Sequence, residues 1–181
     1  MKIVETRVHG LVIEPKTQQH IVVLRELDGL RVLPIWIGPG EALAIQRLVQ
    51  EQEFPRPLTH DLIALVIEGL KARVAQIVIT ELREATFYAK IFIERDKDVL
   101  SIDARPSDSI AVALRTKATI FVNEELLQPP QGPGVPFTPP DPGKPTAPGD
   151  PDSPPTEEDD AERLRRFLEK LNPEDFGKFS M

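Results

Sequence analysis

The chain has 181 residues, with 22 Lys and Arg against 29 Asp and Glu, a net charge of −7, and no cysteine. The absence of cysteine excludes disulfides and zinc sites built from thiolates. The N-terminal segment lacks the apolar core of a signal peptide, and no apolar run approaches the length that spans a membrane. We therefore expect a soluble, cytoplasmic protein that does not enter a membrane.

The composition of the chain changes near Gln128. Twelve of the 19 prolines lie between Pro129 and Pro155. Residues 1–128 carry 16 Lys and Arg against 18 Asp and Glu (net −2), whereas residues 129–181 carry 6 against 11 (net −5). Such a proline-rich, acidic composition is typical of an extended, disordered segment. We predict a globular domain over residues 1–128, a disordered linker over residues 129–160, and a short amphipathic helix and tail over residues 161–181.

The first part of the predicted domain contains three strands and two helices. Asp28-Gly29 is a strong hairpin signal between two strands. Gly38-Pro39-Gly40 ends the third strand, and the prolines of Phe54-Pro55-Arg56-Pro57 end the first helix. The expected elements are strands over residues 3–14, 19–27 and 30–37 and helices over residues 41–53 and 59–70. In the second helix, the residues at core spacing are Leu62, Ile63, Val66, Ile67 and Leu70.

The second part of the predicted domain is again three strands followed by a helix. Leu100 and Ile102 alternate with polar residues, as in a half-buried strand. Pro106 suits the first turn of a helix, and Asp108 lies where the helix dipole favours a carboxylate. Residues 110–114 are apolar almost all round, so we expect this helix to be largely buried. The expected elements are strands over residues 73–82, 86–95, 99–104 and 118–122 and a helix over residues 106–115.

The two parts of the domain also match each other in sequence. A shift of 67 positions lays LPIWIGPGEALAI over LSIDARPSDSIAV, with Pro39 on Pro106 and Glu41 on Asp108. Chance can produce a few apolar matches between any two such segments. Proline and acid at identical offsets favour an internal duplication of a unit of three strands and a helix.

This order of elements predicts the fold class. The helices carry apolar faces that need a sheet to cover, so we expect an α+β domain with a mostly antiparallel mixed sheet and packed helices. A sheet of this kind must protect its edge strands. Pairing of an edge strand or of an apolar helix face across a two-fold axis would do so, and we therefore expect a homodimer.

Several acidic residues fall at or next to helix starts. Glu41, Asp61 and Asp108 each fit a structural role, because carboxylates in a first turn stabilise the helix by about 0.3–1 kcal/mol. Asp103 differs because it precedes its helix on a strand that ends beside the core. It is either a structural partner of Arg105 or Arg115 or part of a functional site.

His60 and three arginines are further candidates for chemistry. A helix N-terminus disfavours the protonated imidazole of His60, which suits a general base or a metal ligand, although a histidine bonded in a turn is the alternative. Arg56, Arg105 and Arg115 could hold phosphate in a bidentate manner, or they could pair with nearby acids. Trp36 could stack on a base, but packing within the domain is the stronger interpretation.

Four segments in this order resemble the bifunctional nuclease family, bacterial and plant proteins credited with cleaving both DNA and RNA. The resemblance covers about residues 3–127, and its segments are LPIWIGPGEALAI, RPLTHDL, FYAKIFI and IDARPSDSIAVALR. The family hallmarks are a histidine–aspartate pair and a DARPSD segment, which fall here on His60 and Asp61 and on residues 103–108. Ser109 stands where many relatives have alanine, a small departure from the family pattern.

The resemblance implies a nuclease that acts on DNA, RNA or both. The residues fit a divalent-metal-dependent phosphodiesterase, in which carboxylates bind Mg²⁺ or Mn²⁺, His60 activates water and arginine stabilises the phosphate charge. The lack of a basic surface argues against nucleic-acid binding, which rests mainly on Lys and Arg. The alternative is a non-catalytic regulatory or ligand-binding domain in which the same Asp, Arg and His residues are structural.

The site residues can be assigned in three groups, which we expect to lie together because polar groups at the rim of a buried helix need partners. The assigned catalytic residues are His60, Asp61, Asp103 and Asp108. The assigned substrate-binding residues are Arg56, Arg105, Ser107 and Arg115. The assigned metal ligands are Asp103 and Asp108. In particular, we expect His60, Asp61, Asp103, Arg105 and Asp108 to converge.

Overall fold

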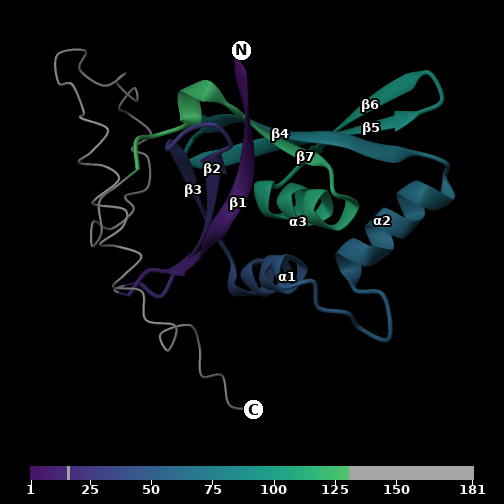
Figure 1. Ribbon diagram of the computed structural model, residues 1–181, viewed down its shortest axis with the longest axis horizontal. Helices are drawn as coiled ribbons and strands as arrows, with labels where there is room; N and C mark the ends of the chain where they lie inside the picture. Colours follow the sequence, from purple (N-terminus) through teal and green to yellow (C-terminus); the bar gives the residue numbers. More distant parts are fainter. Residues whose placement is uncertain (16, 131–181) are drawn as a thin grey trace. The chain divides into compact units, whose positions relative to one another are not determined.

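A computed structural model describes residues 1–15 and 17–130 of the chain. Within these residues, seven strands, three α-helices and one short 3-10 helix form a single sheet with helices packed on it (Figure 1). In chain order they are β1 (Ile3–Ile13), β2 (His20–Glu26), β3 (Val32–Ile37), α1 (Pro39–Val49), α2 (Thr59–Gly69), β4 (Arg73–Arg83), β5 (Thr86–Arg95), β6 (Asp98–Ala104), α3 (Pro106–Thr116), β7 (Thr119–Asn123) and η1 (Glu124–Leu126). Every predicted strand and helix of the domain is present.

The largest difference from the predicted boundaries is the end of α1, which stops at Val49 instead of residue 53. Glu51 adopts the left-handed conformation, with a φ of 51°. The Glu51 amide N–H donates to the carbonyl of Leu48 at 3.1 Å, and the Gln52 N–H donates to the carbonyl of Arg47 at 3.0 Å. These bonds satisfy carbonyls that a helix end leaves unpaired, so α1 ends before the prolines are reached.

The sheet is mixed, with the strand order β3-β2-β1-β7-β4-β5-β6. All neighbouring strands are antiparallel except β4 and β7, which are parallel. The predicted α+β class with a mostly antiparallel sheet is therefore confirmed. The edge strands are β3 and β6, and the parallel pair lies in the middle, where both strands have neighbours on each side.

The two predicted repeat units occupy opposite halves of the sheet. β1, β2 and β3 lie on one side of β7 and lead into α1, whereas β4, β5 and β6 lie on the other side and lead into α3. Both helices have a proline in the first turn. Helix α2 stands between the units and has no counterpart in the second one. This order is compatible with a duplication, which stays a prediction until the backbones of the units are superposed.

The main core lies between the sheet and the helices. In Figure 1, α3 lies beneath the middle of the sheet, and it contacts both α1 and α2. Its residues Ile110 and Val112 are 0% and 1% exposed and belong to the same core cluster as Ile77 of β4 and Ile45 of α1. The prediction that this helix is largely buried is confirmed, because seven residues of α3 are buried. The start of α3 is therefore held firmly against the sheet.

Helix α2 differs from its prediction. None of its residues is buried, and Ile67 alone of the five residues predicted for the core packs against the core cluster. Leu62, Val66 and Leu70 instead remain 57%, 52% and 61% exposed. The prediction that these residues form the core face is wrong, because a helical period identifies an apolar stripe but not the surface that covers it. In this domain, α2 turns that stripe away from the sheet.

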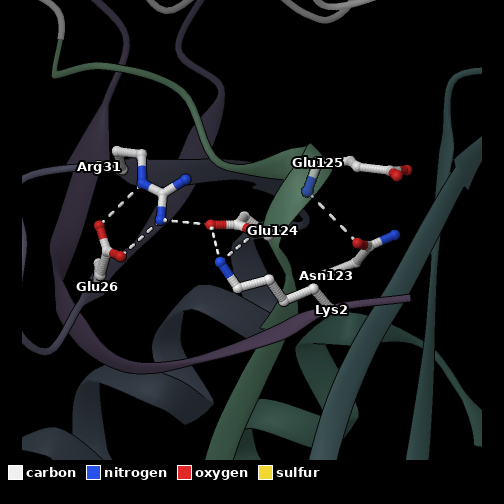
Figure 2. Close-up of polar contacts among 6 residues, drawn as sticks. All are labelled: Lys2, Glu26, Arg31, Asn123, Glu124 and Glu125. Carbon is white, nitrogen blue, oxygen red and sulfur yellow. Dashed lines mark hydrogen bonds and ion pairs between the residues drawn. The ribbon is translucent and has the colours of Figure 1, made fainter. Parts of the chain in front are cut away.

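A cluster of charged side chains joins the β2–β3 hairpin to both ends of the domain (Figure 2). Arg31 donates to Glu26 through Nε and Nη2 at 3.0 and 2.7 Å, and Nη2 also donates to Glu124 at 3.2 Å. Lys2 binds the same Glu124 carboxylate at 2.9–3.0 Å. The hydrogen bond from Arg31 is the main cause of the lowered pKa of the Glu26 carboxyl. One arginine therefore bridges two carboxylates at this corner of the domain.

The described chain continues past the last strand along β3. Gln128 and Val32 exchange two backbone hydrogen bonds of 2.8 Å. The predicted linker over residues 129–160 and the predicted helix and tail over residues 161–181 lie outside the described residues from residue 131 onward. No helix of the described part is both long and apolar enough to cross a membrane.

Candidate active site at the helix N-termini

Three helix N-termini contribute polar side chains to one region of the domain. Glu41 lies in the first turn of α1, His60 and Asp61 in the first turn of α2, and Asp108 in the first turn of α3. Each helix is entered from an extended residue whose side chain makes no capping hydrogen bond. The first backbone N–H groups thus lack a side-chain cap from that residue, and the positive end of each helix dipole favours the acidic side chains.

Arg105 connects the first turns of α1 and α3. Its Nε and Nη2 donate to the two carboxylate oxygens of Asp108 at 2.7 and 3.1 Å, and its Nη1 donates to Glu41 at 2.9 Å. The hydrogen bond to Asp108 is the main reason that the pKa of Arg105 is raised above its ordinary value. The Arg105 side chain is 66% exposed, so the guanidinium group lies at the surface of the site.

His60 extends this chain of contacts to α2. Its Nε2 lies 3.7 Å from Oδ1 of Asp108, and the His60 side chain is 15% exposed. Asp108 therefore faces a guanidinium group on one side and an imidazole on the other. The continuous row Glu41–Arg105–Asp108–His60, which we call the rim network, links the starts of all three helices.

Asp61 and Arg115 form a second tie between α2 and α3. Arg115 Nε donates to Asp61 Oδ1 at 2.9 Å, and Asp61 Oδ2 accepts the backbone N–H of Leu58 at 2.9 Å. Both carboxylate oxygens of Asp61 are thus engaged, one in capping α2 and one in holding α2 to α3. Asp61 thus fixes the start of α2, which carries His60, against α3.

Asp103 lies apart from these residues. It pairs with Lys90 across β5 and β6, one position beyond the pair of Ile102 with Ile91. Ile91 is a core residue, and side chains alternate along a strand, so Asp103 is placed on the sheet face opposite the helices. Asp103 makes no hydrogen bond or ion pair with any residue that the structure describes. The structure therefore brings His60, Arg105 and Asp108 together. Asp61 is next to His60 in the first turn of α2 but pairs with Arg115, and Asp103 lies apart.

The position of Asp103 bears on the predicted metal site. Residues 1–15 and 17–130 contain no group of three or more His, Asp or Glu side chains placed to hold a metal ion together. The two predicted metal ligands, Asp103 and Asp108, lie on a strand and a helix whose side chains face different sides of the sheet. This donor set does not fit a preformed divalent-metal centre.

The remaining candidate residues, Arg56, Ser107 and Trp36, lie outside the rim network. Arg56 is exposed in the loop between α1 and α2, and Ser107 is 7% exposed at the start of α3. Trp36 packs against Ile21, Val23 and Val32 in a separate cluster, and its indole N–H is buried without a hydrogen-bond partner among the described residues. Packing in the domain accounts for the Trp36 ring.

Glu41 is the member of the rim network that the sequence interpretation assigned only to helix stabilisation. Its ion pair with Arg105 joins residues 64 positions apart in the chain. The signal that could have found it is the repeat register, because Glu41 occupies the position of Asp108 in the first unit. Two acids at equivalent helix starts are natural partners for one arginine between them.

The rim network places a histidine, a carboxylate and an arginine within one small region, a combination whose chemistry suits phosphate esters. A histidine beside a carboxylate can accept a proton from water, since the carboxylate orients the ring and stabilises its charged form. A guanidinium group at the surface can bind phosphate oxygens in a bidentate manner. The uncapped N–H groups at the start of α3 add partial positive charge beside it.

A family model shows the family to which the chain belongs. Residues 22–132 match the family model described as the bifunctional nuclease domain, a span that includes the whole rim network. The chain is 39% identical over 172 residues to Uncharacterized protein Rv1829 of Mycobacterium tuberculosis. The aligned residues cover 95% of this chain and 97% of that protein.

Plant relatives match a shorter part of the chain. The chain is 24% identical over 130 residues to Bifunctional nuclease 1 of Oryza sativa subsp. japonica, which covers 70% of this chain and 39% of that protein. It is 27% identical over 109 residues to Bifunctional nuclease 2 of Arabidopsis thaliana, which covers 58% of this chain and 33% of that protein. The shared part in the plant proteins is thus well under half of their length.

Proposed function

Because the chain belongs to the bifunctional nuclease domain family, we propose that it is a nuclease that hydrolyses phosphodiester bonds of DNA, RNA or both. The observation that carries this proposal is the rim network, in which His60, Asp108 and Arg105 lie together at three helix starts. The names of the plant relatives support the choice of substrate. The fold itself would be compatible with many other activities.

In the proposed reaction, His60 is the general base. Its imidazole accepts a proton from water, the water oxygen attacks phosphorus, and the bond from phosphorus to the leaving oxygen breaks while that oxygen takes a proton from solvent. Asp108 orients His60 and stabilises the imidazolium ion that forms. Arg105 stabilises the negative charge that builds up on the phosphate oxygens. Arg115 and Asp61 position α2, and with it His60.

Substrate binding in this proposal rests on few charges. The chain is acidic overall, and the exposed arginines bound to acids of the helix starts are Arg105 and Arg115. Arg56 is exposed in the loop that precedes α2. With only a few phosphate contacts, binding should be weak at physiological salt, and its salt dependence should be shallow compared with that of strongly basic nucleic-acid-binding proteins.

The proposal contains no step through a metal ion, because the donor set does not fit a preformed centre. Mg²⁺ commonly binds through one or two carboxylates together with substrate phosphates. A titration with Mg²⁺ and Mn²⁺ in the presence of substrate is therefore part of the test. An absolute requirement for the ion would add a metal ion held by Asp108 and the substrate phosphate, and loss of that activity in Asp103→Asn would restore Asp103 as a ligand as well.

A second candidate function is a non-catalytic regulatory or ligand-binding domain. The observation that favours it is that the guanidinium group of Arg105 is already engaged, because Nε, Nη1 and Nη2 donate to Glu41 and Asp108. In that case the network is a structural tie between the starts of α1 and α3, and His60 completes it from α2. The two candidates differ in what happens when His60 is replaced.

The deciding experiment compares cleavage of single-stranded DNA, double-stranded DNA and RNA by wild type and by His60→Gln, Asp108→Asn and Arg105→Gln. A matched control is Arg31→Gln, because Arg31 also bridges two carboxylates but lies in the cluster of Figure 2 and not at the helix starts. We expect His60→Gln to reduce the rate by about 10²–10⁴-fold and Arg31→Gln to leave it near that of wild type. Full activity in His60→Gln, or no activity in wild type under any ion condition, would contradict the proposal.

A further inference from the structure

Helix α2 presents an apolar face to solvent in the described part of the chain. The helical spacing of three and four residues places its most exposed apolar side chains on one side, with His60 and Ile67 turned toward the domain on the other. The exposed residues are Leu62, Leu65, Val66 and Leu70, at 57%, 50%, 52% and 61%. We call these four residues the outer face of α2.

We propose that the outer face of α2 binds the same face of a second copy of this chain across a two-fold axis. Charge distinguishes this face from the rest of the domain surface. The outer face carries no ionisable group, whereas residues 1–128 carry 16 Lys and Arg against 18 Asp and Glu, so contact between two copies elsewhere on the domain would bring charged side chains into the interface. Asp61 and Glu68 border this face next to Leu65, and Asp61 is already paired with Arg115. An uncharged apolar face is where two copies of an acidic protein can approach.

Antiparallel packing of the two α2 helices also suits their dipoles. A two-fold axis across the helix places the N-terminus of one α2 beside the C-terminus of the other, where the partial charges are opposite. Other occupants fit this face less well. Nucleic acid requires Lys and Arg at the contact, and helices that bind a membrane surface carry Lys and Arg along their polar face, whereas α2 itself contains neither.

The size of the contact indicates that α2 does not act alone. An 11-residue helix is about 16 Å long, and a stable interface buries about 800 Å² on each partner. Strand β6 can supply the remainder, because Leu100 and Ile102 are 45% and 44% exposed on the sheet face that the helices cover. Figure 1 shows α2 toward the end of the sheet that β5 and β6 form.

The two edges of the sheet differ in a way that agrees with this placement. Edge strand β3 contains Pro34, which lacks an N–H, and Val32 of β3 is paired with Gln128. Edge strand β6 contains no proline and, among the described residues, pairs only with β5. The edge that needs a partner is therefore at the same end of the sheet as α2.

The dimer would also hold the rim network in place. In one subunit, α2 is tied to the domain mainly by His60, Asp61 and Ile67. A second copy packed on the outer face would press α2 toward α3 and fix the position of His60. The inference about the dimer itself does not rest on the proposed activity, because its readout is the mass of the particle.

The test measures the molar mass of the full chain by light scattering after size exclusion at about 50 μM. We expect wild type at twice the chain mass of 20.3 kDa and Val66→Glu at 20.3 kDa with unchanged circular dichroism. Val49→Glu is the matched control, because Val49 is 50% exposed on α1 and Val66 is 52% exposed on α2. This control should stay dimeric. A monomeric wild type would overturn the proposal, even if another molecule covers the outer face. A dimeric Val66→Glu would overturn it as well.

Cross-linking keeps the proposal testable even if Val66→Glu fails to fold. The chain contains no cysteine, so single cysteines report only on their own position. Under mild oxidation, at least one of Leu62→Cys, Val66→Cys and Leu70→Cys should form a disulfide-linked dimer, because residues near a two-fold axis face themselves. Val49→Cys should remain monomeric on a non-reducing gel. The absence of cross-links at all three α2 positions would overturn the proposal.

Discussion

Arg105 Nη1 lies 2.9 Å from Glu41 Oε1, although the two residues are 64 positions apart in the chain. This contact brings the start of α1 to the start of α3. The same guanidinium group holds Asp108 through its other nitrogens. Glu41 therefore competes with any phosphate for the exposed side of Arg105, and its removal should strengthen substrate binding.

Glu41→Gln should lower the KM for a labelled oligonucleotide about two- to fivefold with little change in kcat, because one carboxylate beside an exposed arginine contributes about 0.5–1 kcal/mol. Steady-state kinetics at low ionic strength measure this effect. Glu26→Gln is the matched control, since Glu26 binds Arg31 in the cluster of Figure 2. A raised KM in Glu41→Gln would mean that Glu41 holds Arg105 in its working position.

His9 should make the stability of the protein depend on pH. It lies at an irregularity of β1, and burial, followed by the positive charges of Arg25 and Arg7, lowers its pKa from 6.5. The unfolded chain then binds a proton on His9 at a higher pH than the folded chain does. The free energy of unfolding should therefore fall as the pH decreases below about 6.5.

The measurement for His9 is thermal unfolding between pH 5.0 and 7.5 for wild type and for His9→Gln. The variant should lose less of its melting temperature across this range. Glu26 and Glu124, whose pKa values are lowered from 4.5 by hydrogen bonds to Arg31 and to Lys2 respectively, affect stability only at more acidic pH. Equal slopes in wild type and variant would show that His9 is not the group responsible.

Ile110→Ala should reduce the free energy of unfolding by about 2–5 kcal/mol, because Ile110 is 0% exposed between α3 and the sheet and its truncation leaves a cavity. Denaturation in urea measures the change. Val49→Ala provides a surface comparison, since Val49 is 50% exposed and its truncation should cost less than about 0.5 kcal/mol. Similar midpoints for both variants would place Ile110 outside the cooperative core.

The duplication predicts that Leu33–Ile45 and Leu100–Val112 follow the same backbone path. Superposition of these segments in an experimental structure should align the strand end, the proline at the helix start and the first two helical turns. Trp36 and Asp103 would then occupy equivalent positions near the ends of β3 and β6. A different path through either strand-to-helix turn would rule out the duplication.

The sequence alone determined the local elements of this domain. Alternation of apolar residues identified the strands, and the uniformly apolar run in α3 identified a buried helix, because burial on all sides leaves no polar face. The acids at the helix starts were also recognised, since the helix dipole acts within the first turn. The alternation of Asp103 with Ile102 also places the two side chains on opposite faces, which the predicted convergence of Asp103 with His60 overlooked.

Tertiary structure decided which surfaces meet. The period of α2 revealed an apolar stripe but could not say whether the sheet or another molecule covers it, and the sheet covers the other side. Likewise, the pairing of Arg105 with Glu41 depends on how α1 and α3 pack, which no local pattern encodes. Backbone conformation is set by nearest neighbours in the chain, whereas contacts between distant segments arise only from the packing of the whole core.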